Sequence, residues 1–100
     1  MFEADFSSQS STWCFSVFAA PEAGVTSRVL ELFAKGGVTP SRFHADVVDG
    51  GREGLVIDLH VDGLTDEAAH TIAERMRGLV DVERVLTATK GVARRVGAFA

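Results

Sequence analysis

The chain has one cysteine, Cys14, and no asparagine among its 100 residues. A lone cysteine excludes an internal disulfide and any Cys-x-x-Cys site, which is typical of a reducing compartment, so we expect a cytoplasmic protein. Ten Lys and Arg residues stand against 14 Asp and Glu residues, a net charge of −4, and the basic residues are scattered. Because no basic patch is visible, we expect no nucleic-acid partner.

Long apolar runs and a basic leader are also missing. The first residues carry Glu3 and Asp5 instead of Lys or Arg, and no apolar run approaches the roughly 20 residues that span a bilayer. We therefore expect no membrane partner and no signal peptide. A chain of 100 residues that is 46% hydrophobic is predicted to fold as one domain with a modest core.

Four stretches have the character of β-strands. In the stretch 13–18, the residues that would point to either face of a strand are largely apolar. This pattern predicts a central strand that is covered on at least part of both faces. The stretches 42–48 and 55–61 alternate apolar and polar residues on either side of the turn sequence DGGREG, and they predict a hairpin with one apolar face. The stretch 82–89 is rich in β-formers and predicts a last strand.

Two stretches have the helical period. Gly36-Gly37 ends the first, whose apolar stripe consists of Val25, Val29, Leu32 and Phe33. Thr65 is the predicted N-cap of the second, followed by acidic residues in the first turn. Its stripe consists of Ala69, Ile72, Met76 and Leu79.

The element order β-α-β-β-α-β predicts an α+β, ferredoxin-like fold. It has a four-stranded antiparallel sheet in the order 4-1-3-2, with both helices on one face. The other face would carry Phe18, Val48 and Val56 without cover, so we expect the chain to form a homodimer. We divide the chain into a flexible N-terminal arm (1–11), the domain (12–89) and a C-terminal tail (90–100).

Three motifs lie along the chain at a fixed spacing. They are Gly24-x-x-Ser27-Arg28-Val29-x-x-Leu32-Phe33, then Gly37, then Leu79-Val80-Asp81-Val82 followed by Val85. With them the sequence resembles the ACT-type regulatory domain and, within that family, the small regulatory subunit of acetolactate (acetohydroxyacid) synthase. The resemblance covers about residues 13–89.

This resemblance implies a non-catalytic subunit that dimerises, binds the large catalytic subunit of acetolactate synthase and raises its activity. It implies no cofactor on this chain, since thiamine diphosphate, FAD and magnesium would belong to the large subunit. It also implies an amino-acid effector, valine or another, held by the loop before the first helix. The corresponding positions are Glu22, Ala23, Gly24 and Val25, where backbone N–H groups at a helix start can hold a carboxylate.

The effector loop departs from the family at one position. The family commonly has Asn or Asp three residues before the glycine, and this chain has Pro21, which lacks both the N–H and a side-chain amide. We therefore expect effector binding to be weak or absent. For Gly24, close approach of a ligand and a simple turn are both open, and Arg28 is interpreted as a solvated surface residue.

A possible metal site lies on the polar face of the predicted hairpin. If the turn centres on Arg52, Asp46 faces Asp58 and His44 faces His60. Directly opposed like charges are destabilising, so either a cation sits there or the pairing is shifted by two residues, which leaves the apolar pattern unchanged. No spacing matches a tight zinc motif, so we predict no metal site.

The residues also argue against catalysis. Cys14 is interpreted as a small core residue, because no base lies near it in the sequence. Metallochaperones of this fold need Cys-x-x-Cys, and acylphosphatase-like enzymes need an asparagine, so neither fits. We predict a protein without enzymatic activity of its own. Two alternatives to the acetolactate synthase subunit stay open: a free-standing ACT-type amino-acid sensor and a ligand-free dimerisation module.

Overall fold

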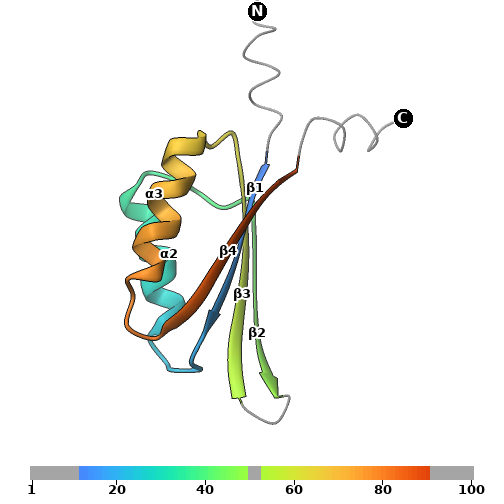
Figure 1. The fold of residues 1–100 in the computed structure, drawn as a ribbon, viewed down its shortest axis with the longest axis vertical. Coiled ribbons are helices and arrows are strands. Elements are labelled where there is room, and N and C mark those ends of the chain that lie inside the picture. Colours follow the sequence, from blue (N-terminus) through green and yellow to red (C-terminus); the bar gives the residue numbers. More distant parts are fainter. Residues whose placement is uncertain (1–11, 50–52, 91–100) are drawn as a thin grey trace, which may run out of the picture.

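The computed structural model describes residues 12–49 and 53–90. Its elements are β1 (Thr12–Ala19), α2 (Val25–Lys35), β2 (Arg42–Asp49), β3 (Glu53–Asp62), α3 (Asp66–Arg77) and β4 (Val82–Lys90). The strands form one antiparallel sheet in the order β2-β3-β1-β4, and both helices cover the same face (Figure 1). This confirms the predicted ferredoxin-like fold. The predicted arm (1–11) and tail residues 91–100 lie outside the described residues, and β4 includes Lys90.

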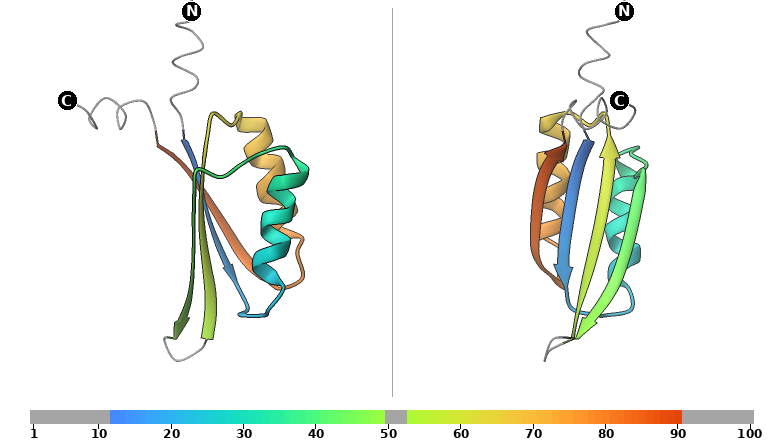
Figure 2. Two further views of the ribbon diagram at one scale, coloured as in Figure 1. Left: turned by 180° about the vertical axis from the view of Figure 1, so that it is seen from behind. Right: turned by 90° about the vertical axis from the view of Figure 1, so that its right-hand side faces the viewer.

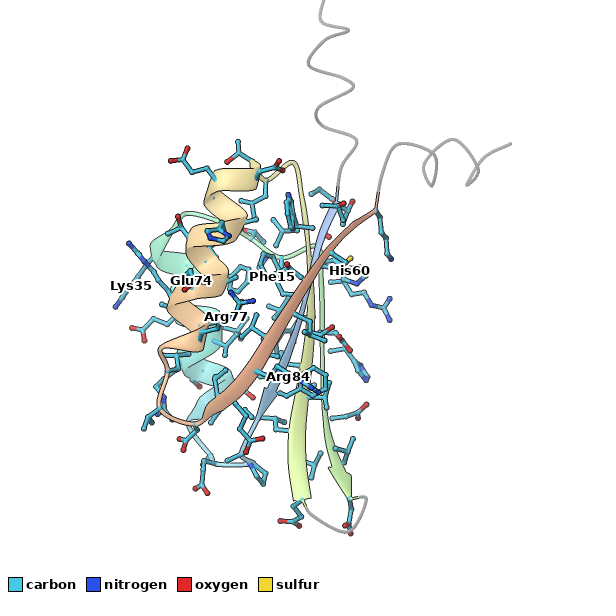
Figure 3. The ribbon with its side chains drawn as sticks, in the orientation of Figure 1. Phe15, Lys35, His60, Glu74, Arg77 and Arg84 are labelled. Atoms are coloured by element: carbon cyan, nitrogen blue, oxygen red, sulfur yellow. The ribbon has the colours of Figure 1, made fainter. Side chains whose placement is uncertain are left out.

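The core lies between the sheet and the helices. Phe15 and Val17 of β1 and Ile57 and Leu59 of β3 are fully buried on this face. The ring of Phe15 meets that of Phe33 on α2 edge-on, with the ring centroids 5.5 Å apart, a favoured aromatic geometry. Figure 3 shows Phe15 between the two layers, while His60 and Arg84 lie on the other side of the sheet.

The helix ends follow the predicted signals. After Lys35, Gly37 has a φ of 71°, a left-handed conformation that glycine adopts at little cost. The Thr65 hydroxyl accepts a hydrogen bond of 3.1 Å from the backbone N–H of Ala68, which caps α3. Both helices are short, and the described residues contain no helix that is long and apolar enough to cross a membrane.

Two alternatives were open for the polar face of the β2–β3 hairpin: like charges that face each other around a cation, or a pairing shifted by two residues. The register of the hairpin decides between them. His44 lies opposite Asp58, and Arg42 lies opposite His60. Asp46 lies opposite Val56, so the two carboxylates do not face each other. The pairing is therefore the one shifted by two residues, and no group of three or more potential metal ligands occurs in the described parts of the chain.

Cys14 is not a core residue. It lies on the face of the sheet that the helices do not cover, is half-buried, and is opposite His60 of β3 and Ala88 of β4. The prediction of a core position was wrong because both alternating sets of β1 are largely apolar, so the sequence pattern did not show which set faces the helices. The pairing with His60, 46 residues away along the chain, was also invisible in the sequence.

Candidate functional site

The loop between β1 and α2 contains the predicted effector positions. Two backbone hydrogen bonds within the loop stabilise it. The Glu22 N–H donates to the Ala20 carbonyl (2.8 Å), and the Val25 N–H donates to the Glu22 carbonyl (3.2 Å). The side chain of Val25 is buried in the core, with 1% exposed. Of the four predicted positions, Glu22 and Ala23 are exposed and Gly24 is half-buried. Two of the four backbone N–H groups are thus already engaged.

Arg28 lies above this loop. Its guanidinium forms an ion pair of 3.0 Å with the carboxylate of Asp81, just before β4. A Cβ atom at Gly24 would lie 2.6 Å from Nη1 of Arg28. The φ of Gly24 is −92°, which any residue adopts, so the backbone conformation does not require glycine here, and a larger residue would only need the flexible Arg28 side chain to move. Arg28 is therefore partly exposed and paired, not simply solvated.

The sequence analysis named Asp81 within the motif Leu79-Val80-Asp81-Val82 but did not place it at this site. Its carbonyl accepts a hydrogen bond of 2.9 Å from the Ala20 N–H, so it joins the end of β1 to the start of β4. The signal for its place here was topological, because strands 1 and 4 are neighbours in the predicted order and the loops at that end must meet. Asp81 keeps the Arg28 charge occupied and puts a carboxylate beside the loop.

The donors left for a small anion are the N–H groups of Ala23 and Gly24, for which the described residues provide no backbone acceptor. They lie at the start of α2, where the helix dipole favours negative charge, and Gly24 provides no side-chain cap. The loop can thus accept a carboxylate through the backbone alone. A ligand carboxylate would also compete with Asp81 for the Arg28 guanidinium.

A groove of about 320 Å³ lies elsewhere, between the last turn of α2 and the first turns of α3. Its lining is apolar at Leu32, Val38 and Ile72 and polar at its rim. The polar rim includes Thr65, Glu67, Thr71 and Arg75. About 10 Å of helix separates Val25 of the effector loop from Leu32 of the groove, since each of the seven residues between these positions rises 1.5 Å. The cavity and the predicted effector positions are therefore separate places.

The uncovered face of the sheet is polar along its middle. The Ser16 hydroxyl donates to the Asp58 carboxylate at 3.0 Å. His44 and Asp46 are in contact at 2.8 Å between Nε2 and Oδ2. Of the predicted apolar residues, Phe18 and Val56 are half-buried and Val48 is 45% exposed.

The Arg84 guanidinium covers the ring of Phe18 on this face, 4.5 Å from its centroid. A cation over an aromatic ring is a favourable contact and shields the ring from water. All three predicted residues do lie on this face, but it is less apolar than the sequence suggested.

Comparison with known families identifies the domain. A family model described as "ACT-like domain" matches residues 7–92. The chain belongs to the ACT-like domain family. ACT domains are regulatory modules that typically bind amino acids and dimerise, and they have no catalytic role of their own. No curated protein sequence matches the chain.

Solved structures share the ACT-like fold at low sequence identity. The ACT domain from GTP pyrophosphokinase of Chlorobium tepidum has a TM-score of 0.66 and 12% identity, covering 77% of this chain and 96% of that chain. The C-terminal domain of the MgtC protein from Mycobacterium tuberculosis has a TM-score of 0.66 and 13% identity, with coverages of 81% and 88%. The regulatory subunit of aspartate kinase from Thermus flavus has a TM-score of 0.57 and 10% identity, with coverages of 77% and 50%.

Proposed function

We propose that this ACT-like domain is a non-catalytic regulatory subunit of acetolactate synthase. It pairs with a second copy, binds the large catalytic subunit and raises its turnover. The observation that carries the proposal is the motif Gly24-x-x-Ser27-Arg28, which lies at the junction of β1 and α2 in an ACT-like domain. A regulatory subunit of another enzyme, aspartate kinase, is among the proteins with a similar fold.

The surface for the large subunit lies outside the surface used for self-pairing. We place it on the exposed side of the helices and on the basic residues at the end of the chain: Lys90, Arg94 and Arg95. Arg94 and Arg95 lie outside the described residues. Cationic groups at a rim increase the association rate with an acidic patch and make it sensitive to salt.

The effector positions of the proposed subunit are the loop residues Glu22, Ala23, Gly24 and Val25. The backbone N–H groups of Ala23 and Gly24 hold the effector carboxylate in this proposal. Because Pro21 provides no side-chain amide and Asp81 already occupies Arg28, effector affinity is low. Activation of the large subunit therefore does not require valine.

Co-purification with the large subunit tests the proposal. The protein alone should have no acetolactate synthase activity, and adding it to the cognate large subunit should raise turnover. Bovine serum albumin at the same concentration is the control for non-specific stabilisation. The proposal is wrong if the full-length chain neither co-purifies with the large subunit nor activates it. Calorimetry then decides between the two alternatives. Binding of an amino acid would favour the free-standing sensor, and no binding would favour the ligand-free dimerisation module.

A further inference from the structure

The groove between α2 and α3 has an apolar lining that the described residues leave partly exposed. Its volume is about 320 Å³, and its apolar lining includes Leu32, Val38 and Ile72. Leu32 and Val38 are half-buried at the margin of the core, and Ile72 is 7% exposed. A concave apolar surface of this size accommodates one or two large side chains of a binding segment. The groove is therefore a candidate docking surface.

The rim of the groove has opposite charges at its two ends. Glu67 lies in the first turn of α3, and Arg75 lies about 12 Å further along the helix, since eight residues rise 1.5 Å each. Asp66 adds a second carboxylate beside Glu67. The last turn of α2 ends next to the groove at Gly36, where the helix dipole favours a cation. The end of the groove at the start of α3 therefore favours basic groups.

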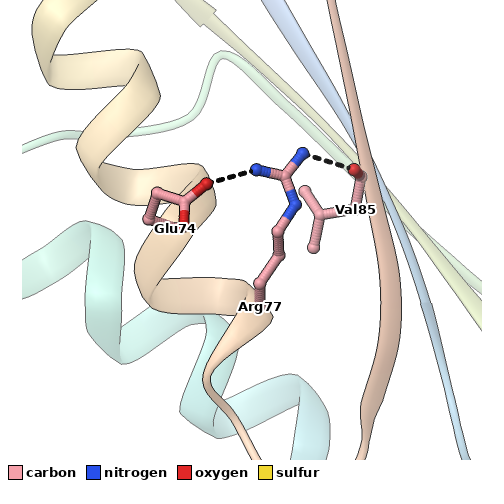
Figure 4. A network of polar contacts seen from close by, with 3 residues as sticks. All are labelled: Glu74, Arg77 and Val85. Atoms are coloured by element: carbon pink, nitrogen blue, oxygen red, sulfur yellow. Dashed lines mark hydrogen bonds and ion pairs between the residues drawn. The ribbon is translucent and has the colours of Figure 1, made fainter.

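The two arginines of α3 differ in their partners. The Arg77 guanidinium contacts the Glu74 carboxylate and donates to the Val85 carbonyl, each at 2.7 Å (Figure 4). Among the described residues, the Arg75 side chain has no ion pair and no hydrogen bond. An unpaired guanidinium beside an apolar surface can stack on an aromatic ring. The Arg75 end of the groove therefore suits an aromatic side chain.

The chain leaves the sheet near this groove. Lys90, the last residue of β4, is paired with Thr12, and Thr12 is paired with Asp62 at the end of β3. Two strand spacings of about 4.8 Å separate Lys90 from Asp62, and Thr65 follows three residues later. The end of β4 and the start of α3 lie at the same end of the molecule (Figure 1), and α3 lies behind β4 and β1 in the right-hand view of Figure 2. The path from Lys90 to the start of α3 is therefore at most about 20 Å.

The segment that follows β4 is long enough to reach the groove and has the matching charge. Residues 91–100 have the sequence GVARRVGAFA and lie outside the described residues. Ten extended residues span up to about 33 Å, more than the path to the start of α3. The segment contains two arginines and no acidic residue, whereas residues 1–11 contain Glu3 and Asp5 and no lysine or arginine. Charge therefore favours the segment after β4 over the segment before β1.

The spacing along the segment also fits the groove. Arg95 and Phe99 are four residues apart, about 13 Å in an extended chain. This is close to the distance of about 12 Å between Glu67 and Arg75 along α3. A segment that enters at the start of α3 reaches the carboxylates first and Arg75 last. Its arginine can then pair with Glu67 while its aromatic ring stacks on the Arg75 guanidinium over the apolar lining.

We propose that residues 91–100 dock in the groove between α2 and α3 of the same chain, with Arg95 at Glu67 and Phe99 at Arg75. The proposal does not rest on the proposed function, because it involves only residues of this chain. Docking removes the aromatic ring and the apolar lining of the groove from water. In the proposed subunit the same segment contacts the large subunit, so the groove and the large subunit compete for it.

Disulfide trapping in the full-length chain with Cys14→Ser tests where the segment docks. Thr71→Cys, in the lining of the groove, combined with Ala98→Cys should form an intrachain disulfide under mild oxidation, because docking brings the two residues within disulfide range. His70→Cys with Ala98→Cys is the matched control, since His70 is exposed on α3 and does not line the groove. The first pair should form at least about tenfold faster than the control pair. Non-reducing electrophoresis and mass spectrometry at low protein concentration separate intrachain from interchain bonds.

Three further substitutions, each added to the trapping pair, test the individual contacts. Phe99→Ala should lower the trapping rate to that of the control pair, because it removes the large apolar side chain. Glu67→Gln should lower the rate about two- to fivefold, the effect expected of an exposed ion pair. Glu83→Gln makes the same charge change on an exposed residue near the start of β4 and should have no effect. Circular dichroism checks that each variant is folded.

Each outcome decides one part of the proposal. Equal trapping rates for the two cysteine pairs would overturn docking in the groove. Disulfides that form only between chains would overturn docking within one chain and assign the groove to the segment of a second copy. Fast trapping that survives Phe99→Ala would overturn the placement of the aromatic ring. These measurements do not involve the large subunit, so a failure of docking and a failure of activation are observed separately.

Discussion

Two arginines connect the helices to β4 and to the turn before it. Arg28 on α2 pairs with Asp81, 53 residues away, and Arg77 on α3 donates to the Val85 carbonyl. The two contacts differ in how much they contribute to stability. Arg28 meets a carboxylate near the surface, where an ion pair contributes little, whereas Arg77 satisfies a part-buried backbone carbonyl that would otherwise lose a hydrogen bond.

Arg77→Ala should lower the free energy of unfolding by about 1 kcal/mol, because it leaves the Val85 carbonyl without its side-chain donor. Glu74→Gln is the matched control. It breaks only the exposed ion pair of 2.7 Å with Arg77 and should cost less than about 0.5 kcal/mol. Urea unfolding followed by circular dichroism measures both. Equal losses in the two variants would assign the stabilisation to the ion pair instead of the carbonyl.

Pro21 is the residue that sets effector affinity in the proposed function. Valine binding to the wild type should be weak or undetectable by calorimetry, because only loop N–H groups are left for the carboxylate. Pro21→Asn should strengthen binding roughly ten- to a hundredfold, since a hydrogen bond to a charged group contributes about 1.5–3 kcal/mol.

Pro21→Ala is the control for removing the ring without adding an amide, and it should not strengthen binding. Micromolar valine affinity in the wild type would refute the role given to Pro21. An unchanged affinity in Pro21→Asn would move the effector site away from this loop.

The two helices begin differently. Thr65 caps α3 through its hydroxyl, and the acidic residues Asp66 and Glu67 follow in the first turn. At the start of α2, Gly24 provides no side-chain cap and no acidic residue follows. A helix start without these groups keeps its N–H groups available to a ligand, while a capped start is committed to stability. The element that carries the proposed effector loop is thus the less stabilised of the two.

Thr65→Ala should destabilise the domain by about 1 kcal/mol through loss of the N-cap. Thr71→Ala, on an exposed position in the middle of α3, should be neutral or slightly stabilising, because alanine has the higher helix propensity. The midpoints of urea unfolding distinguish them. A loss in Thr71→Ala as large as that in Thr65→Ala would show that the cap is not the cause.

At the scale of the molecule, the sheet provides three surfaces with different chemistry. The helix-covered face forms the core, the open face is polar along its middle, and β2 forms an edge on which Phe43, Val47 and Val48 are exposed. β4, which ends at Lys90, forms the other edge of the sheet.

Deleting residues 91–100 should leave folding and dimerisation unchanged and should weaken activation of the large subunit, most strongly at low salt, because high salt already screens the charges of the tail in the full-length chain. The truncation keeps Lys90 because β4 includes it, paired with Thr12. Full-length chain with Arg94→Gln and Arg95→Gln is the charge control. If activation by the truncated chain equals that of the full-length chain, the contact lies on the helices alone.

The sequence by itself determined the element order, both helix ends and the strand order. These follow from local signals: apolar residues at periods of 2 and 3.6, the cap at Thr65, the Gly36-Gly37 stop, and the chirality of the crossovers. The structure confirms each of them, except that α3 ends at Arg77, so Leu79 of the predicted stripe lies beyond the helix. The same local patterns located the loop before α2, so the proposed effector positions were within reach of the sequence, although the structure does not test their role.

Only the tertiary structure decided the register of the hairpin, the side of the sheet on which Cys14 lies, and the pairing of Arg28 with Asp81. A shift of two residues leaves every side chain on the same face, so the periodicity could not choose between His60 and Asp58 as the neighbour of His44. When the residues on both faces of a strand are apolar, the sequence pattern does not show which face the helices cover. Contacts between residues far apart in the sequence depend on packing of the whole sheet and its helices, and local patterns contain no information about that packing.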